Sequence, residues 1–279
     1  MRKVNVGGIK VGGGEPFALI AGPCVIEGEK LTRRVAASLR DVTAELGIPF
    51  IFKSSYDKAN RTSVRSFRGP GLDKGLKILK AIREELGVPV LSDVHRFEEI
   101  ERAAEVLDVA QVPAFLCRQT DFVMELARNA KVVNIKKGQF LAPWDMANVV
   151  RKVEAAGNRN ILITERGASF GYNNLVSDMR SIPILRGMGY PVVFDATHSV
   201  QLPGGAGEAS DGERAMAVYL ARAAAAVGVD ALFLEVHPEP DRARCDGPNS
   251  LALDSLRDLL RMLQGIDGIV KKDMKKGRR

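Results

Sequence analysis

One short segment of the chain concentrates groups that could bind anions. The stretch KSSYDKANRTSVRSFRGPG, residues 53–71, directly follows the apolar run IPFIF. Its charged members are Lys53, Asp57, Lys58, Arg61, Arg65 and Arg68. Clustered cations repel one another unless an anion lies among them, and the arginine fork suits phosphate and carboxylate oxygens. The segment therefore predicts a site for more than one anionic group.

A second set of residues could hold a metal ion. It consists of Cys24, His198, Glu235 and Asp246, which offer one thiolate, one imidazole and two carboxylates. These donors suit a divalent transition metal such as Zn or Fe(II). Each residue alone is weak evidence, because a single cysteine is often a small buried hydrophobe and a single acid is usually solvated. Metal ligation and separate structural roles are both open at this point.

Eight short apolar runs, which alternate with helical patterns, must position both sets. The runs cover residues 17–22, 49–54, 88–94, 108–113, 131–137, 160–167, 191–197 and 230–237. They are nearly continuous in apolar residues, which is typical of parallel strands covered on both faces. Eight strand–helix units in about 250 residues predict an α/β fold, a (β/α)8 TIM barrel, with an open doubly wound sheet as the alternative.

The whole chain, residues 1–279, is predicted to form a single barrel domain. The segment VNVGGIKVGGGEPF indicates a short N-terminal β-hairpin at about residues 3–16, which could plug the N-terminal end of the barrel. The segment 271–279, KKDMKKGRR, has six cations and one acid and so supplies +5 of the net charge of +7. We interpret this basic C-terminal tail as a solvated end, with a nucleic-acid-binding arm as the alternative.

Polar residues fall at the carboxyl ends of the predicted strands, where TIM barrels carry their active sites. Besides the cationic segment, these ends carry Cys24, Asp93, His95, Phe115, Gln119, Lys136, Arg166, Asp195, His198, Gln201, Glu235 and Asp246. Barrel closure places the eighth strand beside the first and the seventh beside the eighth. The four residues of the possible metal site would then meet on one wall, next to converging cations.

The composition argues against several classes of protein. With 279 residues, 46% of them apolar and 27% charged, the chain can bury a full core. No apolar run approaches the roughly 18 residues of a membrane span, so no membrane partner is expected. We expect no signal peptide, and three cysteines are too few for a disulfide framework, which predicts a cytoplasmic location. With 6% aromatic residues, a nucleic-acid groove is not expected.

Eight motifs of the chain together resemble the family of 3-deoxy-D-manno-octulosonate 8-phosphate synthases, or 2-dehydro-3-deoxyphosphooctonate aldolases. The motifs are FALIAGPCVIE, IPFIFKSSYDKANRTSVRSFRGPG, SDVH, QVPAFLCRQTD, NIKKGQF, ERGASFGYNNLVSDM, FDATHSVQ and FLEVHPEPDRARCDGPNSL. The resemblance covers about residues 4 to 267. The related 3-deoxy-D-arabino-heptulosonate 7-phosphate synthases typically have KPRTSP where this chain has KANRTS.

The resemblance implies a transferase that condenses phosphoenolpyruvate with D-arabinose 5-phosphate and water. The methylene carbon of phosphoenolpyruvate would attack the aldehyde, water would add at the neighbouring carbon, and phosphate would leave by carbon–oxygen cleavage. The product, 3-deoxy-D-manno-octulosonate 8-phosphate, leads to the inner-core sugar of lipopolysaccharide. The alternative is the heptulosonate reaction with erythrose 4-phosphate. The implied partners are small phosphorylated substrates and further copies of the chain, in a homotetramer with sites near subunit interfaces.

The resemblance also implies roles for individual residues in binding the two substrates. Phosphoenolpyruvate would contact Lys53, Ser55, Lys58, Lys136 and Arg166. Arabinose 5-phosphate would contact Asn60, Arg61, Thr62 and Ser63. The strand-end residues Phe115, Gln119 and Gln201 complete the predicted substrate-binding set. Independently of the resemblance, the length and glycine content of segment 199–213 predict a lid that closes over the site, with an ordinary mobile loop as the alternative.

The family has a metal-dependent branch, which carries Cys where the other branch carries Asn. Cys24 places this chain with the first branch, and so implies one divalent ion per subunit, Zn, Fe(II), Mn or Co. Its ligands would be Cys24, His198, Glu235 and Asp246. The ion would either orient and polarise the aldehyde or activate the attacking water. The predicted catalytic set is Cys24, His198, Asp93, His95 and Asp195, although Asp93 and Asp195 could instead hold loops and cations.

Overall fold

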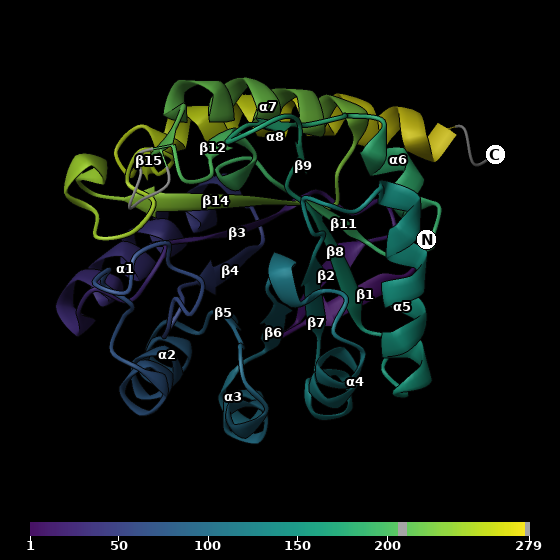
Figure 1. Cartoon of the computed structure of the whole chain (residues 1–279). Coiled ribbons are helices and arrows are strands. Elements are labelled where there is room, and N and C mark those ends of the chain that lie inside the picture. Colours follow the sequence, from purple (N-terminus) through teal and green to yellow (C-terminus); the bar gives the residue numbers. More distant parts are fainter. Residues whose placement is uncertain (206–210, 277–279) are drawn as a thin grey trace.

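Eight parallel strands close into a barrel in the computed structural model, which describes residues 1–205 and 211–276. The strands are β3 (Ala18–Gly22), β4 (Phe50–Lys53), β5 (Val90–Asp93), β6 (Val109–Val112), β7 (Val133–Lys136), β8 (Ile161–Glu165), β11 (Val192–Asp195) and β14 (Ala231–His237). They pair in this order, and β14 pairs with both β11 and β3, which closes the ring (Figure 1). The predicted TIM barrel is confirmed, and the open sheet is wrong.

Helices surround the barrel and cover the outer face of its strands (Figure 1). They are α1 (Glu29–Leu46), α2 (Leu72–Leu86), α3 (Ile100–Val106), α4 (Thr120–Asn129), α5 (Met146–Ala155), α6 (Ser181–Arg186), α7 (Arg214–Val227) and α8 (Leu256–Lys276). Helix α1 shows why these segments are helical: its buried positions Thr32, Val35, Ala36 and Leu39 follow the spacing of one helix face. The helix ends at Leu46, and the φ of 66° at the following Gly47 suits the left-handed termination.

Short strands and 3₁₀ segments lie in the loops that lead from a barrel strand to the next helix. The two-residue strands are β9 (Ala168–Ser169), β10 (Leu175–Val176), β12 (Gln201–Leu202), β13 (Asp211–Gly212) and β15 (Leu251–Ala252). The 3₁₀ segments are η1 (Phe97–Glu99), η2 (Ala114–Leu116), η3 (Pro143–Asp145), η4 (His198–Val200) and η5 (Pro240–Arg242). Segment η2 follows β6 and carries Phe115, and segment η4 follows β11 and carries His198.

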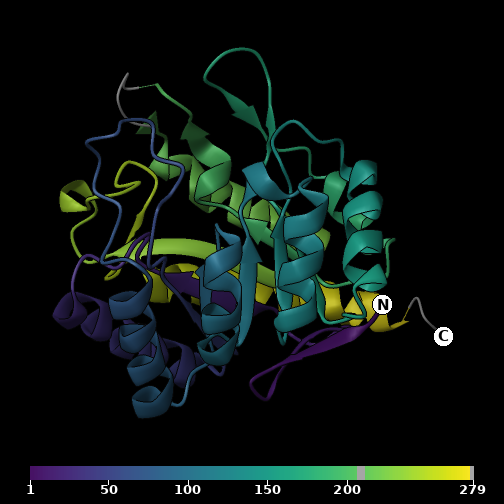
Figure 2. The same ribbon diagram turned by 60° about the horizontal axis from the view of Figure 1, so that its bottom comes forward.

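The N-terminal hairpin closes one end of the barrel, as the sequence predicts. Strands β1 (Lys3–Val6) and β2 (Ile9–Gly12) pair antiparallel and lie against the barrel (Figure 2). The buried side chains of Val4, Val6 and Val11 form one apolar cluster with inward residues of the barrel strands. In β3 the neighbouring positions alternate between this cluster and the outer core that packs on the helices. Each strand is thus apolar on both faces, and its polar groups lie at its carboxyl end.

The basic C-terminal segment is more ordered than the sequence suggests, and its interpretation as a solvated end is wrong for Lys271. Helix α8 continues to Lys276, and Lys271 is buried. Its Nζ donates to the Val229 carbonyl at 2.7 Å and lies 3.7 Å from Asp230 and 3.8 Å from Asp267. Residues 277–279 lie outside the described part of the chain. None of the described helices is both long and apolar enough to cross a bilayer.

Candidate active site

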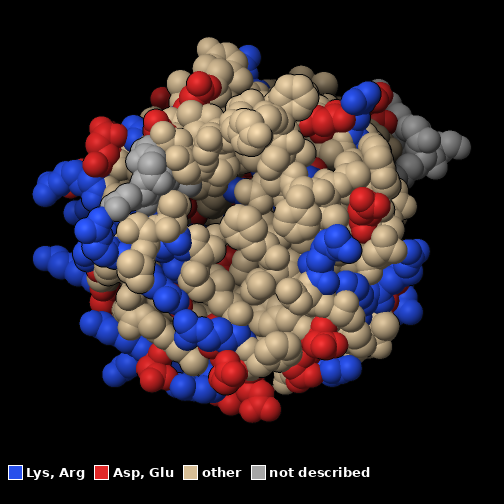
Figure 3. Space-filling view, in the orientation of Figure 1, with Lys and Arg blue, Asp and Glu red and all other residues tan. Residues whose placement is uncertain are grey.

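A cavity of about 160 Å³ opens at the carboxyl ends of the barrel strands. It is lined by Lys58, Asn60, Arg61, Thr62, Asp93, His95, Pro113, Ala114, Phe115, Lys136, Gln139, Arg166, His198, Gln201, Pro203, Gly204, Cys245 and Asp246. Figure 3 shows this face hollowed near its centre, with charged atoms visible inside the hollow. The cavity therefore combines cations from the cationic segment, from the end of β7 and from the residue after β8 with acids and sulfur that lie next to them.

Three buried cations face this cavity. Lys136 Nζ lies 2.8 Å from Asp195 and 4.1 Å from the centre of the Phe233 ring. Burial lowers the pKa of Lys136 and of Arg166 from their ordinary values. Burial alone would also lower the pKa of Lys58, but nearby Cys24, Glu235 and Asp93 raise it well above its usual value. An incoming anion would find charges that have little water around them, where electrostatic attraction is strongest.

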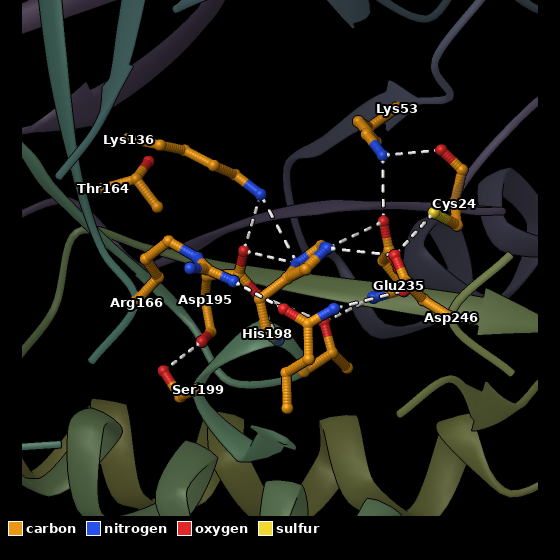
Figure 4. Close-up of polar contacts among 12 residues, drawn as sticks. Cys24, Lys53, Lys136, Thr164, Arg166, Asp195, His198, Ser199, Glu235 and Asp246 are labelled. Carbon is orange, nitrogen blue, oxygen red and sulfur yellow. Dashed lines mark hydrogen bonds and ion pairs between the residues drawn. The ribbon is translucent and has the colours of Figure 1, made fainter. Parts of the chain in front are cut away.

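The imidazole of His198 is held in one orientation by Asp195 (Figure 4). Asp195 Oδ2 lies 2.8 Å from His198 Nδ1, and Asp195 Oδ1 accepts hydrogen bonds from Thr197 Oγ1 and from the His198 backbone N–H. Burial would raise the pKa of Asp195, but His198 and Lys136 lower it well below the usual range. The other ring nitrogen, His198 Nε2, therefore points to Glu235 at 3.5 Å and to Asp246 at 3.6 Å.

A sulfur group lies on the other side of Asp246. Cys24 Sγ is 3.0 Å from Asp246 Oδ2 and 2.9 Å from Cys245 Sγ. Burial, the contact with Cys245 and the charge of Asp246 raise the pKa of the Cys24 thiol. Gly22 allows β3 and β4 to lie close together just before Cys24, because a Cβ at this position would lie 1.9 Å from the Lys53 carbonyl oxygen. Asp246 itself has a φ of 49°, a left-handed conformation that asparagine and aspartate tolerate best among non-glycine residues.

The four predicted metal ligands are distributed over two groups that share Asp246. One group is His198, Glu235 and Asp246, and the other is Cys24, Cys245 and Asp246, each with its donor atoms within 4.8 Å of one another. Among the described residues, Glu235 Oε2 is buried without a hydrogen-bond partner. A buried acceptor of this kind and a set of sulfur, imidazole and carboxylate donors fit a divalent transition-metal ion.

Two predicted substrate contacts lie beneath the cavity rather than on its wall. Lys53 Nζ donates to the Cys24 carbonyl at 2.9 Å and to Glu235 Oε1 at 3.0 Å, and the side chain is buried. Ser55 donates to Asp93 Oδ2 at 2.5 Å. Both side chains thus hold acidic groups of the site in place, and direct contact with substrate remains a prediction for them.

Two other predicted contacts lie away from the cavity wall. Gln119 is exposed at the start of α4, and Ser63 is half-buried in the loop after β4. Residues 206–210 of the predicted lid lie outside the described part of the chain. The flanks of that segment are joined by pairing of Gln201 with Gly212. Of the other predicted contacts, Asn60, Arg61, Thr62, Phe115 and Gln201 line the cavity.

Asp93 is fixed by a chain of polar side chains inside the barrel. Gln111 donates to Asp93 Oδ1 at 2.5 Å, Asn134 donates to Gln111 at 2.7 Å, and Thr164 donates to Asn134 at 2.6 Å. The strand register sets this order, because Asp93 faces Gln111 and Gln111 faces Asn134. Burial would raise the pKa of Asp93, but Lys58, Lys53 and Lys136 lower it below its usual range. Burial lowers the pKa of the neighbouring His95.

Two residues of the site with polar or sulfur-bearing side chains, Gln139 and Cys245, are missing from the sequence-based prediction. Gln139 lines the cavity, and its Oε1 has no hydrogen-bond partner among the described residues. Cys245 directly precedes Asp246 and brings a second thiol to the site. Position next to a proposed ligand is a signal for Cys245, and the motif NIKKGQF contains Gln139 three residues after Lys136. Both residues therefore have a local signal in the sequence.

Known proteins match this chain over nearly its whole length. A family model described as the DAHP synthetase I family matches residues 2–272. A protein of Geotalea uraniireducens named 2-dehydro-3-deoxyphosphooctonate aldolase is 64% identical over 271 residues, which cover 97% of this chain and all of that protein. Proteins with the same name from Geobacter metallireducens and Geobacter sulfurreducens are 63% and 59% identical, each over 97% of this chain and 99% of their own length.

Proposed function

The chain belongs to the DAHP synthetase I family, and we propose that its cavity binds phosphoenolpyruvate and D-arabinose 5-phosphate together. The enzyme condenses them with water to 3-deoxy-D-manno-octulosonate 8-phosphate and phosphate, a step toward the inner-core sugar of lipopolysaccharide. The names of the relatives support this reaction over the heptulosonate alternative. The observation that carries the proposal is the convergence of Lys58, Arg61, Lys136 and Arg166 on one cavity beside the sulfur–imidazole–carboxylate wall.

The charges of the site match those of the two substrates. Two phosphates and one carboxylate must lie close together before the new carbon–carbon bond forms, and four converging cations offset their repulsion. We assign Lys136 and Arg166 to phosphoenolpyruvate, since they are the most buried of the four cations that line the cavity. Asn60, Arg61 and Thr62, on the loop after β4, would hold the sugar phosphate. Fixing both partners in one orientation supplies much of the acceleration of a two-substrate reaction.

Polar side chains around the reacting carbons would control protons. Asp195 keeps the proton on His198 Nδ1, so that Nε2 presents a lone pair to the wall of the cavity. Asp93 stays ionised, because Lys58, Lys53 and Lys136 lower its pKa, and its negative charge would hold these cations in place beside the substrates. Lys53 neutralises Glu235 from below, which keeps that acid ionised and oriented.

We propose that one divalent ion is held at this wall by Cys24, His198, Glu235 and Asp246. When bound, such an ion supplies Lewis acidity for a carbonyl oxygen or a water molecule. The unpartnered Glu235 Oε2 and the shared Asp246 Oδ2 support this assignment. We expect this ion to be Zn, Fe(II), Mn or Co. Metal analysis of the purified protein tests this expectation.

We further propose a cytoplasmic homotetramer with sites near subunit interfaces. Large apolar side chains are exposed on loops that follow the barrel strands, including Phe115, which lines the cavity, Phe140, and Tyr172, which is 98% exposed. Such side chains are typical of surfaces that contact another protein. Sedimentation analysis of the purified chain should give the mass of four copies, and a monomer at all concentrations would contradict this assembly.

The activity is tested by supplying two aldehydes in parallel. Phosphoenolpyruvate with D-arabinose 5-phosphate should release phosphate, and product mass should match the eight-carbon acid. Turnover with erythrose 4-phosphate alone would instead support the heptulosonate reaction. Arg166→Lys keeps the charge but loses the planar fork, so it should raise KM for phosphoenolpyruvate. Arg180→Lys, at an exposed position outside the cavity, is the matched control.

A further inference from the structure

Cys245 places a second sulfur at the proposed metal site. Its Sγ lies 2.9 Å from Cys24 Sγ and 3.4 Å from Asp246 Oδ2, and the side chain is 3% exposed. The group formed by these three residues is as compact as the group formed by His198, Glu235 and Asp246. Because Asp246 Oδ2 belongs to both groups, the two sulfurs face the same carboxylate oxygen as the imidazole.

We propose that Cys245 is a ligand of the metal ion, so that the site offers two thiolates rather than one. This inference rests on the proposed function in one respect: both concern the same metal site. Bonds from Zn²⁺ are about 2.3 Å to sulfur and about 2.0–2.2 Å to oxygen. One ion can therefore touch two sulfurs up to about 4.6 Å apart and a sulfur and an oxygen up to about 4.4 Å apart. The distances among Cys24, Cys245 and Asp246 all lie below these limits.

A second thiolate changes which ions the site prefers. Thiolates favour soft and borderline ions such as Zn²⁺, Co²⁺ and Cd²⁺, whereas carboxylates and imidazole also serve harder ions such as Mn²⁺. A thiophilic ion would be bound mainly by the two sulfurs and Asp246, and Mn²⁺ mainly by His198, Glu235 and Asp246. The site therefore discriminates between metals through Cys245.

Arg61 gives the second thiolate a charged partner. Its Nη1 donates to Cys245 Sγ at 2.7 Å, while its Nε is buried without a hydrogen-bond partner among the described residues. A cationic donor to a ligating sulfur offsets the negative charge that two thiolates and two carboxylates bring to one ion. Arg61 lies on the loop after β4, so the occupancy of the metal site and the position of this loop are linked.

The ligand count can be measured without turnover. Full-length protein loaded with Co²⁺ should show sulfur-to-cobalt charge-transfer absorption, and Cys245→Ser should lower this absorption per bound ion by about half. Cys24→Ser should do the same. Cys117→Ser, which removes the thiol outside both groups, is the matched control and should leave the absorption unchanged. Unchanged absorption in folded Cys245→Ser would overturn the proposal.

A measurement on the unmodified protein keeps the inference testable if Cys245→Ser does not fold, and a second measurement applies if it does. X-ray absorption at the zinc edge of the unmodified protein should find two sulfur neighbours, and one sulfur neighbour would refute the proposal. In folded Cys245→Ser, affinity for Cd²⁺ should fall by about ten-fold or more while affinity for Mn²⁺ falls much less. Equal losses for both ions would contradict it. Since none of these readouts depends on substrate, failure of the two-aldehyde assay would leave the sulfur count intact.

Discussion

The buried ion pair of Lys136 and Asp195 allows a quantitative prediction. Asp195 is fully buried and lies 2.8 Å from both Lys136 Nζ and His198 Nδ1. Asp195→Asn keeps the shape of the side chain but removes its charge, which leaves Lys136 as a buried cation without its ion-pair partner. Breaking a buried pair in this way costs about 3–5 kcal/mol of the free energy of unfolding. At about 2–4 °C per kcal/mol, Tm should fall by roughly 6–20 °C.

The same substitution should change how stability depends on pH. Burial lowers the pKa of folded Lys136, and the charge of Asp195 opposes this effect. In Asp195→Asn the folded pKa therefore falls further below the unfolded value of about 10.4. Between these two values the unfolded chain binds more protons than the folded chain, so stability rises with pH. The variant should recover part of its lost stability as the pH rises toward 10, with a larger recovery than the parent protein shows.

Urea unfolding followed by circular dichroism, at about pH 7 and about pH 9.5, measures both effects. Asp195→Asn combined with Lys136→Met removes both charges, so the double variant should lose less stability than the sum of the two single variants. The reasoning fails if Asp195→Asn costs less than about 1 kcal/mol and the two substitutions are additive.

Further predictions concern the helix α8 anchor, the hairpin and the metal. Lys271→Met should cost about 3 kcal/mol in urea unfolding, since Asp230 and Asp267 lose a buried cation; exposed Lys272→Met should change stability by less than about 0.5 kcal/mol. Val11→Ala removes two buried methyl groups at the hairpin end, so Tm should fall by an amount equivalent to about 1–3 kcal/mol, while kcat of the folded enzyme stays constant; a changed kcat would argue against the separation of plug and site. Removing metal with a chelator should abolish phosphate release, and added Zn²⁺, Co²⁺ or Mn²⁺ should restore it; full activity in metal-free protein would contradict the metal assignment.

Much of the barrel could be predicted from the chain because strand and helix patterns are local. Each of the eight predicted apolar runs contains one barrel strand, and the hairpin at residues 3–16 contains β1 and β2. Local patterns were less informative at the C-terminus, where KKDMKKGRR looks like a solvated end. Lys271 is buried there because helix α8 packs against the barrel and brings this side chain to Asp230. That contact joins residues 41 positions apart, and it cannot be predicted from the charge composition of the segment.

The sequence by itself determined the barrel fold, the strand ends at which the functional side chains lie, and the kinds of polar residue found there. These features depend on periodicity and on barrel closure, which the order of strands dictates. The tertiary structure decided how deep each side chain lies and which donors meet. It placed Lys53 under Glu235 rather than in the cavity, and it brought Cys245 to Cys24 across 221 residues of chain. Such distances are set by loop paths and side-chain packing, which sequence spacing does not specify.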